Sequence, residues 1–236
     1  MNKFMSWLED SFVPKANKLF SRPFIAAFAS TMQKIIPFIL TGSVIYFYNV
    51  IKSFVPVLPD LSPILTYSFG IITVIVAFMM GNQLMEKLGH PDYVINAGLC
   101  SVGTLLMVAM PLGENADSIS SLMGNLGAAG IAVGLIVGLY VGTIFHLWGK
   151  LHFLQDSSCP DFVTAWINTI VPNLITLGIA MILVNVLKLD VYSLVIAAFM
   201  PLANIGQTLP GFILICLIPA FFYTLGISSW TFGAVT

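Results

Sequence analysis

Apolar runs about as long as a bilayer is thick constrain this chain more than any other feature of its sequence. Residues 191–236, for example, contain no charged side chain. Charged residues make up 8% of the whole chain and hydrophobic residues 58%, whereas a soluble domain carries about 25% charged residues. Such a chain cannot cover its surface in water, so we expect it to lie in a membrane. The net charge of −1 gives no indication of a nucleic-acid partner.

Five of these runs are long enough to cross a bilayer as helices, which takes about 20 mostly apolar residues. Two further apolar segments follow and separate at the stretch 204–211, which contains Gly and Pro. We therefore predict an all-α polytopic membrane protein with five to seven membrane helices. The expected spans are residues 35–51, 63–80, 93–110, 129–148 and 166–187, with an acidic loop at 111–128. A start of the first span upstream of Lys34 is the alternative to residue 35.

Residues 1–22 interleave apolar side chains such as Phe12 and Leu19 with charged ones such as Lys15 and Lys18. This pattern is typical of an amphipathic helix that lies on the membrane surface, and a solvated tail is the alternative. Residues 23–188 then form a scaffold that contains the five spans.

The distribution of Lys and Arg predicts the orientation, because short cytoplasmic loops carry an excess of these residues. With the N-terminus in the cytoplasm, six of them lie on the cytoplasmic side and two on the opposite side; Lys34, at the edge of a span, is left out. The six are Lys3, Lys15, Lys18, Arg22, Lys87 and Lys150, and the two are Lys52 and Lys188. We therefore expect a cytoplasmic N-terminus.

Four glycines in the fourth span recur at every fourth position, so they share one face of a helix. They are Gly130, Gly134, Gly138 and Gly142. There is little hydrophobic driving force between helices in lipid, and glycine lets two backbones approach closely and gain dispersion contacts. We interpret this face as packed tightly against another helix, within the chain or across a dimer.

The sequence shows no set of residues with the spacing of a catalytic or metal site. Its three histidines, His90, His146 and His152, are scattered and have no carboxylate at metal-ligand spacing. Neither a Ser/His/Asp set nor a Gly-rich phosphate loop can be assembled, so we expect no catalytic residue, no metal and no cofactor. The odd number of cysteines argues against a disulfide framework.

Polar but uncharged residues gather late in the chain, where each needs a hydrogen-bond partner or a water-filled cavity. Amides, hydroxyls and an indole suit a neutral sugar, which offers hydroxyls to bond and C–H faces to stack. Bonding between helices is an equally good alternative for any single residue. The candidate substrate-binding residues are Asn204, Gln207, Gly226, Ser228, Ser229 and Trp230. The density of Gly, Ser and Thr in 225–236 favours a broken or re-entrant segment.

Five short stretches, in their order along the chain, carry a resemblance to a known family. They are "MNKFMSWLEDSFVPKANKL", "MQKIIPFILTGS", "CPDFVTAWINTIVPNLIT", "MPLANIGQTLPG" and "YTLGISSW". Together they resemble the membrane component, enzyme IIC, of the lactose/cellobiose (chitobiose) family of the bacterial phosphoenolpyruvate-dependent sugar phosphotransferase system. The likeness runs the length of the chain.

The chain departs from the family pattern at several positions. Ala29-Ser30-Thr31 stand where the family often has Arg-Asp-Gly, and Ala203 stands where it often has Gln. Ser228 replaces a sugar-contacting histidine, and Ser229 replaces the glycine that follows it. Family members are also nearly twice this length, so we expect an N-terminal fragment. Residues 221–236 would be the start of a re-entrant hairpin, and 189–236 the beginning of an incomplete sugar-binding transport domain.

The resemblance implies group translocation in a bacterial inner membrane. A IIC subunit binds a disaccharide of the cellobiose, lactose or chitobiose class and presents it to a soluble IIB partner, which a IIA component supplies with phosphate. The phosphocysteine belongs to IIB, and Cys159, in a loop between spans, is not that residue. The chain would thus be part of a transferase complex without carrying phosphate itself. Family members are homodimers, which the glycine face of the fourth span would suit.

Two other interpretations remain open. The chain is a truncated membrane assembly module that does not transport, as the loss of the histidine at Ser228 suggests. Alternatively, it is an unrelated secondary transporter. The absence of charge deep in a span argues against proton coupling, whereas sodium coupling through carbonyl groups stays open.

Overall fold

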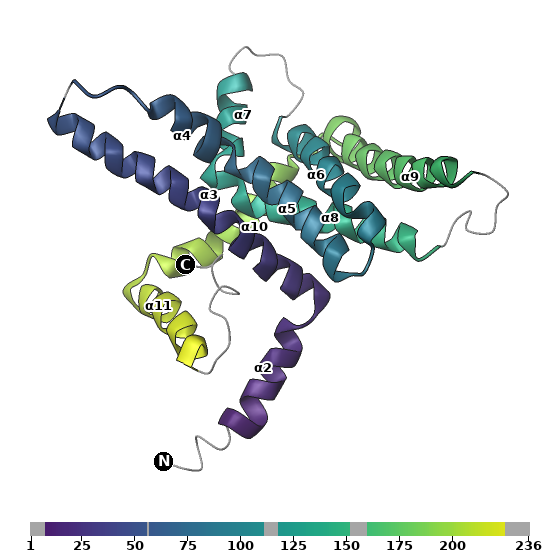
Figure 1. Ribbon diagram of the computed structural model, residues 1–236, viewed down its shortest axis with the longest axis horizontal. Helices are drawn as coiled ribbons and strands as arrows, with labels where there is room; N and C mark the ends of the chain where they lie inside the picture. The colour runs from purple at the N-terminus through teal and green to yellow at the C-terminus, as the bar shows by residue number, and fades with distance from the viewer. Residues whose placement is uncertain (1–7, 56, 111–117, 152–159, 225–236) are drawn as a thin grey trace.

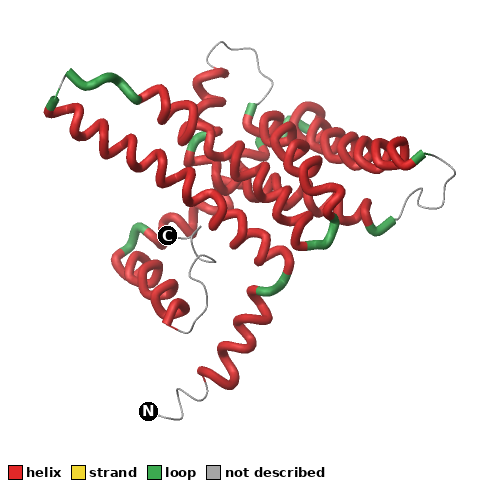
Figure 2. Tube along the Cα trace, in the orientation of Figure 1, coloured by secondary structure: helices red, strands yellow, loops and turns green. Residues whose placement is uncertain are grey.

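The chain folds into helices joined by short connections, as the sequence predicts (Figure 2). The computed structural model describes residues 8–55, 57–110, 118–151 and 160–224, and within these ranges there is no strand. Among the described residues, five helices are long and apolar enough to cross a membrane, or six if a bent pair near the C-terminus counts as one span. The fold is therefore that of a multi-pass membrane protein.

The first membrane helix, α3, is longer than predicted. It is continuous over Pro23–Phe54, 32 residues, although Pro37 lies inside it. Its start is defined by Arg22, which has an extended backbone (ψ 135°), and by Pro23, whose ring favours the first helical position. The sequence placed this span at about 35–51 and left open a start upstream of Lys34. That lysine does not end the helix, because its ammonium group pairs with Glu86 of a neighbouring helix at 3.4 Å.

The remaining helices match the predicted spans closely, with two additions. The second span bends through a 3₁₀ turn, η2, and the predicted loop 111–128 contains a short helix, α7. The elements are α4 (Ser62–Ser68), η2 (Phe69–Ile71), α5 (Ile72–Lys87), η3 (Pro91–Tyr93), α6 (Val94–Ala109), α7 (Ser118–Leu126), η4 (Ala128–Gly130), α8 (Ile131–Gly149), α9 (Asp161–Met181), the π-helical turn η5 (Ile182–Val186), α10 (Val191–Gly206) and α11 (Leu209–Thr224). Before α3 lie the π-helical turn η1 (Leu8–Phe12) and α2 (Val13–Phe20).

Hydrogen bonds from side chains explain why α7 forms inside a segment that reads as a loop. The Thr73 hydroxyl donates to the Gly127 carbonyl at 2.6 Å, and the Asn125 amide donates to the Ala109 carbonyl at 3.0 Å. These bonds attach the end of α7 to α5 and α6. Sequence periodicity does not reveal them, because their partners lie far apart in the chain.

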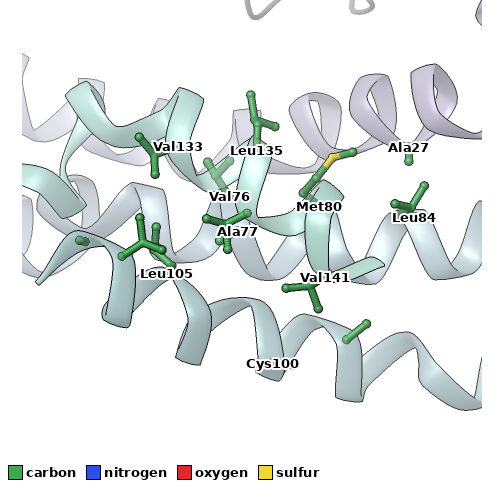
Figure 3. Close-up of a cluster of buried hydrophobic side chains, with 14 of the residues drawn as sticks. Ala27, Val76, Ala77, Met80, Leu84, Cys100, Leu105, Val133, Leu135 and Val141 are labelled. Carbon is green, nitrogen blue, oxygen red and sulfur yellow. The ribbon is translucent and has the colours of Figure 1, made fainter. Parts of the chain in front are cut away.

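The hydrophobic core lies where α5, α6 and α8 meet, with α3 packed against α5 (Figures 1 and 3). Met80 and Leu84 of α5, Leu105 of α6 and Val141 of α8 are fully buried. Ala27 of α3 is also buried in this cluster. The outer helices bury much less, as expected for helices that face lipid.

The glycine face of α8 packs against α5 of the same chain. A Cβ atom at Gly138 would lie 2.5 Å from the Met80 Cβ and 2.9 Å from the Ala77 carbonyl oxygen. At Gly134 and Gly142 it would approach Thr73 and Leu84 just as closely. The two backbones are thus in direct contact, and this face is not available to a second copy of the chain.

Gly138→Ala is expected to destabilise the fold by about 1–3 kcal/mol, because a methyl group there overlaps atoms of α5 that the packed core holds in place. Thermal unfolding of the detergent-solubilised protein measures the effect. Gly178→Ala in α9 is the matched control, since no atom lies within 4 Å of its added methyl group. Equal stability of the two variants would contradict this packing.

An ion pair and two hydrogen bonds hold the connection between α3 and α4 in place. Asp60 accepts hydrogen bonds from the backbone N–H and hydroxyl of Ser62, at 3.1 and 2.8 Å, and pairs with Lys52 at 3.1 Å. These contacts, led by the two bonds from Ser62, lower the pKa of Asp60 to about 2. The carboxylate therefore stabilises the folded chain above its ordinary pKa of 3.8, and this contribution is lost as the pH falls toward 2.

Asp60→Asn is therefore expected to lower the unfolding temperature at neutral pH. The difference from the parent protein should shrink as the pH is lowered from about 5 toward the native pKa, because protonation removes the same charge. Thermal unfolding at a series of pH values tests this. A difference that is the same at every pH would show that the charge of Asp60 has no role.

Candidate functional site

The predicted sugar-contacting amides, Asn204 and Gln207, lie where α10 ends and the chain turns into α11. Asp190 caps the N-terminus of α10, and its carboxylate accepts bonds from the N–H and hydroxyl of Ser193 at 2.9 and 2.6 Å. These bonds lower the pKa of Asp190, so the cap stays charged at neutral pH. α10 and α11 meet at an angle of 95°, so the pair forms a broken span or a re-entrant loop.

The bend is fixed by its own hydrogen bonds. The Thr208 hydroxyl accepts the Gly211 N–H at 3.2 Å, and the Thr208 carbonyl accepts the Phe212 N–H at 2.8 Å. Gly211 lies directly against the Ile205 carbonyl, so a side chain does not fit there. Gln207 and Thr208 thus form a tight turn, and the Leu-Pro-Gly stretch that follows makes the first turn of α11.

Asn204 and Gln207 are three residues apart, on one face of the end of α10, and both side chains are exposed. Each amide can donate and accept a hydrogen bond, which suits a hydroxyl-rich ligand. The other four predicted residues, Gly226, Ser228, Ser229 and Trp230, lie outside the described residues. Within the described part, the two amides therefore lie near each other on an exposed face.

A cavity of about 410 Å³ lies between α3, α4, α7 and the two 3₁₀ turns. Its walls include Tyr46, Thr66, Phe69 and Met123, together with the backbone of Gly127. The Tyr46 and Phe69 rings meet edge to face, with centroids 6.2 Å apart. No charged side chain lines it, so it suits an apolar occupant better than an ion.

Two of the three histidines are not scattered, contrary to the expectation from the sequence. Nε2 of His90, before η3, lies 2.8 Å from Nδ1 of His146 on α8. The His90 ring also lies against the Gly149 backbone and beside the Tyr93 ring. The two residues are 56 positions apart, and the only signal in the sequence is that both fall at the same side of the membrane. No third metal ligand joins them among the described residues.

The histidine contact is expected to stabilise the end of α8 by about 1 kcal/mol, the net value of a typical hydrogen bond. His90→Leu and His146→Leu should each lower thermal stability, and the double variant should lose less than the sum of the two. A double-mutant cycle measures this coupling. Strictly additive losses would indicate that the rings do not interact.

A chain of polar side chains extends from Lys34 into the bundle. Glu86 accepts bonds from Lys34 at 3.4 Å and from the Gln83 amide at 2.7 Å. Gln83 also donates to Asn82 at 2.9 Å, although Gln83 is 1% exposed. Thr31, at a position where the sequence departs from the family pattern, is buried and donates to the Met79 carbonyl at 3.4 Å. The Lys34–Glu86 and Thr31–Met79 contacts join α3 to α5, while the bonds of Gln83 lie within α5.

The fold and these sites define a class, that of helical multi-pass membrane proteins, here with five candidate membrane helices followed by a bent helix pair in the described residues. Comparison with protein-family models and with curated protein sequences gives no match. Among solved structures, the chain is similar to the crystal structure of the transporter ChbC, the IIC component from the N,N'-diacetylchitobiose-specific phosphotransferase system. The TM-score is 0.76 at 17% identity over 97% of this chain. The chain therefore has the fold of this IIC component and spans 59% of its length.

Proposed function

We infer that this chain is a sugar-specific membrane component of a bacterial phosphotransferase system. The similarity in fold to a IIC component over 97% of the chain carries this proposal. The ordered motifs of the sequence point independently to the same family. The likeness favours this function over an unrelated secondary transporter, because an unrelated protein is not expected to share the helix arrangement of a IIC component.

In this proposal the parts of the chain have separate roles. Residues 23–188 form the scaffold, and 189–236 begin the domain that binds a disaccharide. Asn204 and Gln207 contribute amides to the sugar, together with Gly226, Ser228, Ser229 and Trp230. The chain orients the sugar and excludes water, while a IIB partner, supplied by IIA, provides the phosphoryl group. The N-terminus lies in the cytoplasm of a bacterial inner membrane, and two copies form a homodimer.

Phosphate-dependent uptake is the test of this proposal. Inverted or intact membranes that contain the chain are supplied with N,N'-diacetylchitobiose or cellobiose, with and without soluble IIA and IIB proteins and phosphoenolpyruvate. We expect the sugar to cross only with the complete set and to appear as its phosphate ester. Uptake of unmodified sugar driven by a sodium gradient would support a secondary transporter. Association into dimers without any uptake would support an assembly module.

Gln207→Ala and Asn204→Ala are expected to raise the sugar concentration for half-maximal uptake roughly tenfold each, since losing one partner of a desolvated hydrogen bond costs about 1–3 kcal/mol. Asn185→Ala in η5, which removes an amide from another part of the membrane region, is the matched control and should leave uptake unchanged. Unchanged affinity in both α10 variants would exclude these amides from the sugar site and leave the proposed function intact.

A further inference from the structure

The contact between His90 and His146 joins two connections of the bundle. His90 lies in the turn between α5 and η3, and His146 lies in the last turn of α8, three residues before its end at Gly149. The chain then continues from α8 toward α9, so the two rings link the α5–α6 connection to the start of the α8–α9 connection (Figure 1). A change in this contact therefore acts directly on the end of α8.

The backbone of His90 is held on both sides. α5 ends in a Schellman motif, in which the His90 N–H donates to the Met85 carbonyl at 3.0 Å. The Gly89 N–H donates to the Glu86 carbonyl at 3.3 Å, and Gly89 has the positive φ, 77°, that the motif requires. The His90 carbonyl then accepts the Tyr93 N–H at 3.2 Å. We therefore expect a change in the histidine pair to move the end of α8 rather than this turn.

The His90 ring lies directly against the last turn of α8. A Cβ atom at Gly149 would be 2.9 Å from Cε1 and 3.0 Å from Nδ1 of that ring. Both rings are partly exposed, so protons can reach them from the solvent. Any rotation of the His90 ring therefore disturbs the last turn of α8.

The two facing nitrogens have room for one proton. Nε2 of His90 lies 2.8 Å from Nδ1 of His146, so one of them donates and the other accepts. The bond persists as long as one of the two nitrogens keeps its lone pair. When both rings are protonated, two N–H groups face each other and two positive charges repel. An unperturbed imidazole takes up its proton near pH 6.5, so the second proton binds in the acidic range.

No carboxylate compensates a second charge on the pair. On the elements packed around it, the titratable and charged side chains are Glu86, Lys87, Asp92, Tyr93, Cys100, Tyr140 and Lys150. Glu86 is bonded to Lys34 and Gln83 instead, and Asp92 is exposed. Neither histidine ring forms an ion pair within the described part of the chain. A second proton on the pair is therefore opposed by the first.

We propose that His90 and His146 form a pH-sensitive latch. At neutral pH it holds the last turn of α8 against the α5–α6 connection, and it releases that turn when both rings are protonated. The latched state holds one proton between the facing nitrogens, whereas the released state can bind two. Lowering the pH through the acidic range therefore favours release. The effect is confined to the end of α8 and the segment that leads to α9, because the core of α5, α6 and α8 contains no histidine.

Hydrogen exchange on the full chain in phosphatidylcholine nanodiscs tests this proposal. Exchange is compared at about pH 7.5 and about pH 5, on either side of the ordinary imidazole pKa, with a metal chelator present and with rates corrected for the intrinsic effect of pH. The amides of Lys150 and Leu151 report on the last turn of α8, because both donate to carbonyls of that turn, at 3.2 and 2.9 Å. We expect them to exchange roughly five- to tenfold faster at the lower pH, the effect of losing one hydrogen bond. The α6 amides should not change.

Two variants remove the response to acid, and a third is the matched control. In His146→Gln and His90→Gln the amide can still form a hydrogen bond but does not take up a proton. Acid should therefore not speed the exchange of the last turn of α8 in either variant. His152→Gln removes a histidine that lies outside the described residues and should keep the response of the parent chain.

Three outcomes would overturn the proposal. The first is equal exchange of the last turn of α8 at both pH values in the parent chain. The second is a response in His146→Gln and His90→Gln as large as that of the parent, or one that disappears in His152→Gln. The third is a loss of protection throughout α6 in the parent and all variants alike, because acid would then act on the whole fold and not on the pair.

Discussion

The close contact between α8 and α5 is possible because the glycines on the facing side of α8 have no side chains. The rest of the membrane part of this chain packs around this contact. In lipid, apolar side chains gain little by leaving the solvent, so packing has to come from close approach and dispersion. Three glycines along one face of α8, Gly134, Gly138 and Gly142, provide this approach over most of the helix. α6 and α3 then pack on the resulting pair, and their buried residues complete the core.

The sequence predicted the fold class and the five spans because length and hydropathy determine which segments can cross a bilayer. It did not predict α7, and it left open whether α3 starts before Lys34. Both depend on contacts between distant residues, such as Thr73 with Gly127 and Lys34 with Glu86. It also left open whether the glycine face served the chain itself or a dimer. Any homodimer of this protein has to use another surface.

The candidate site was predicted less completely than the fold. The turn between α10 and α11 follows from Gly211 and its neighbours, and the structure places Asn204 and Gln207 beside that turn. The pairing of His90 with His146 could not be predicted, because two histidines 56 residues apart meet only through the packing of their helices. A pattern of residue types predicts what a segment can do, whereas its partners depend on the tertiary arrangement.

The length of α3 has a consequence for the surrounding bilayer. Its 32 residues extend about 48 Å, whereas the hydrocarbon layer is about 30 Å thick. Large apolar side chains continue to its far end, where Phe54 is 81% exposed. Such a hydrophobic mismatch is relieved by tilting the helix or by thickening the lipid around it. The energy of this protein in a membrane should therefore depend on acyl-chain length, and thicker bilayers should suit α3 best.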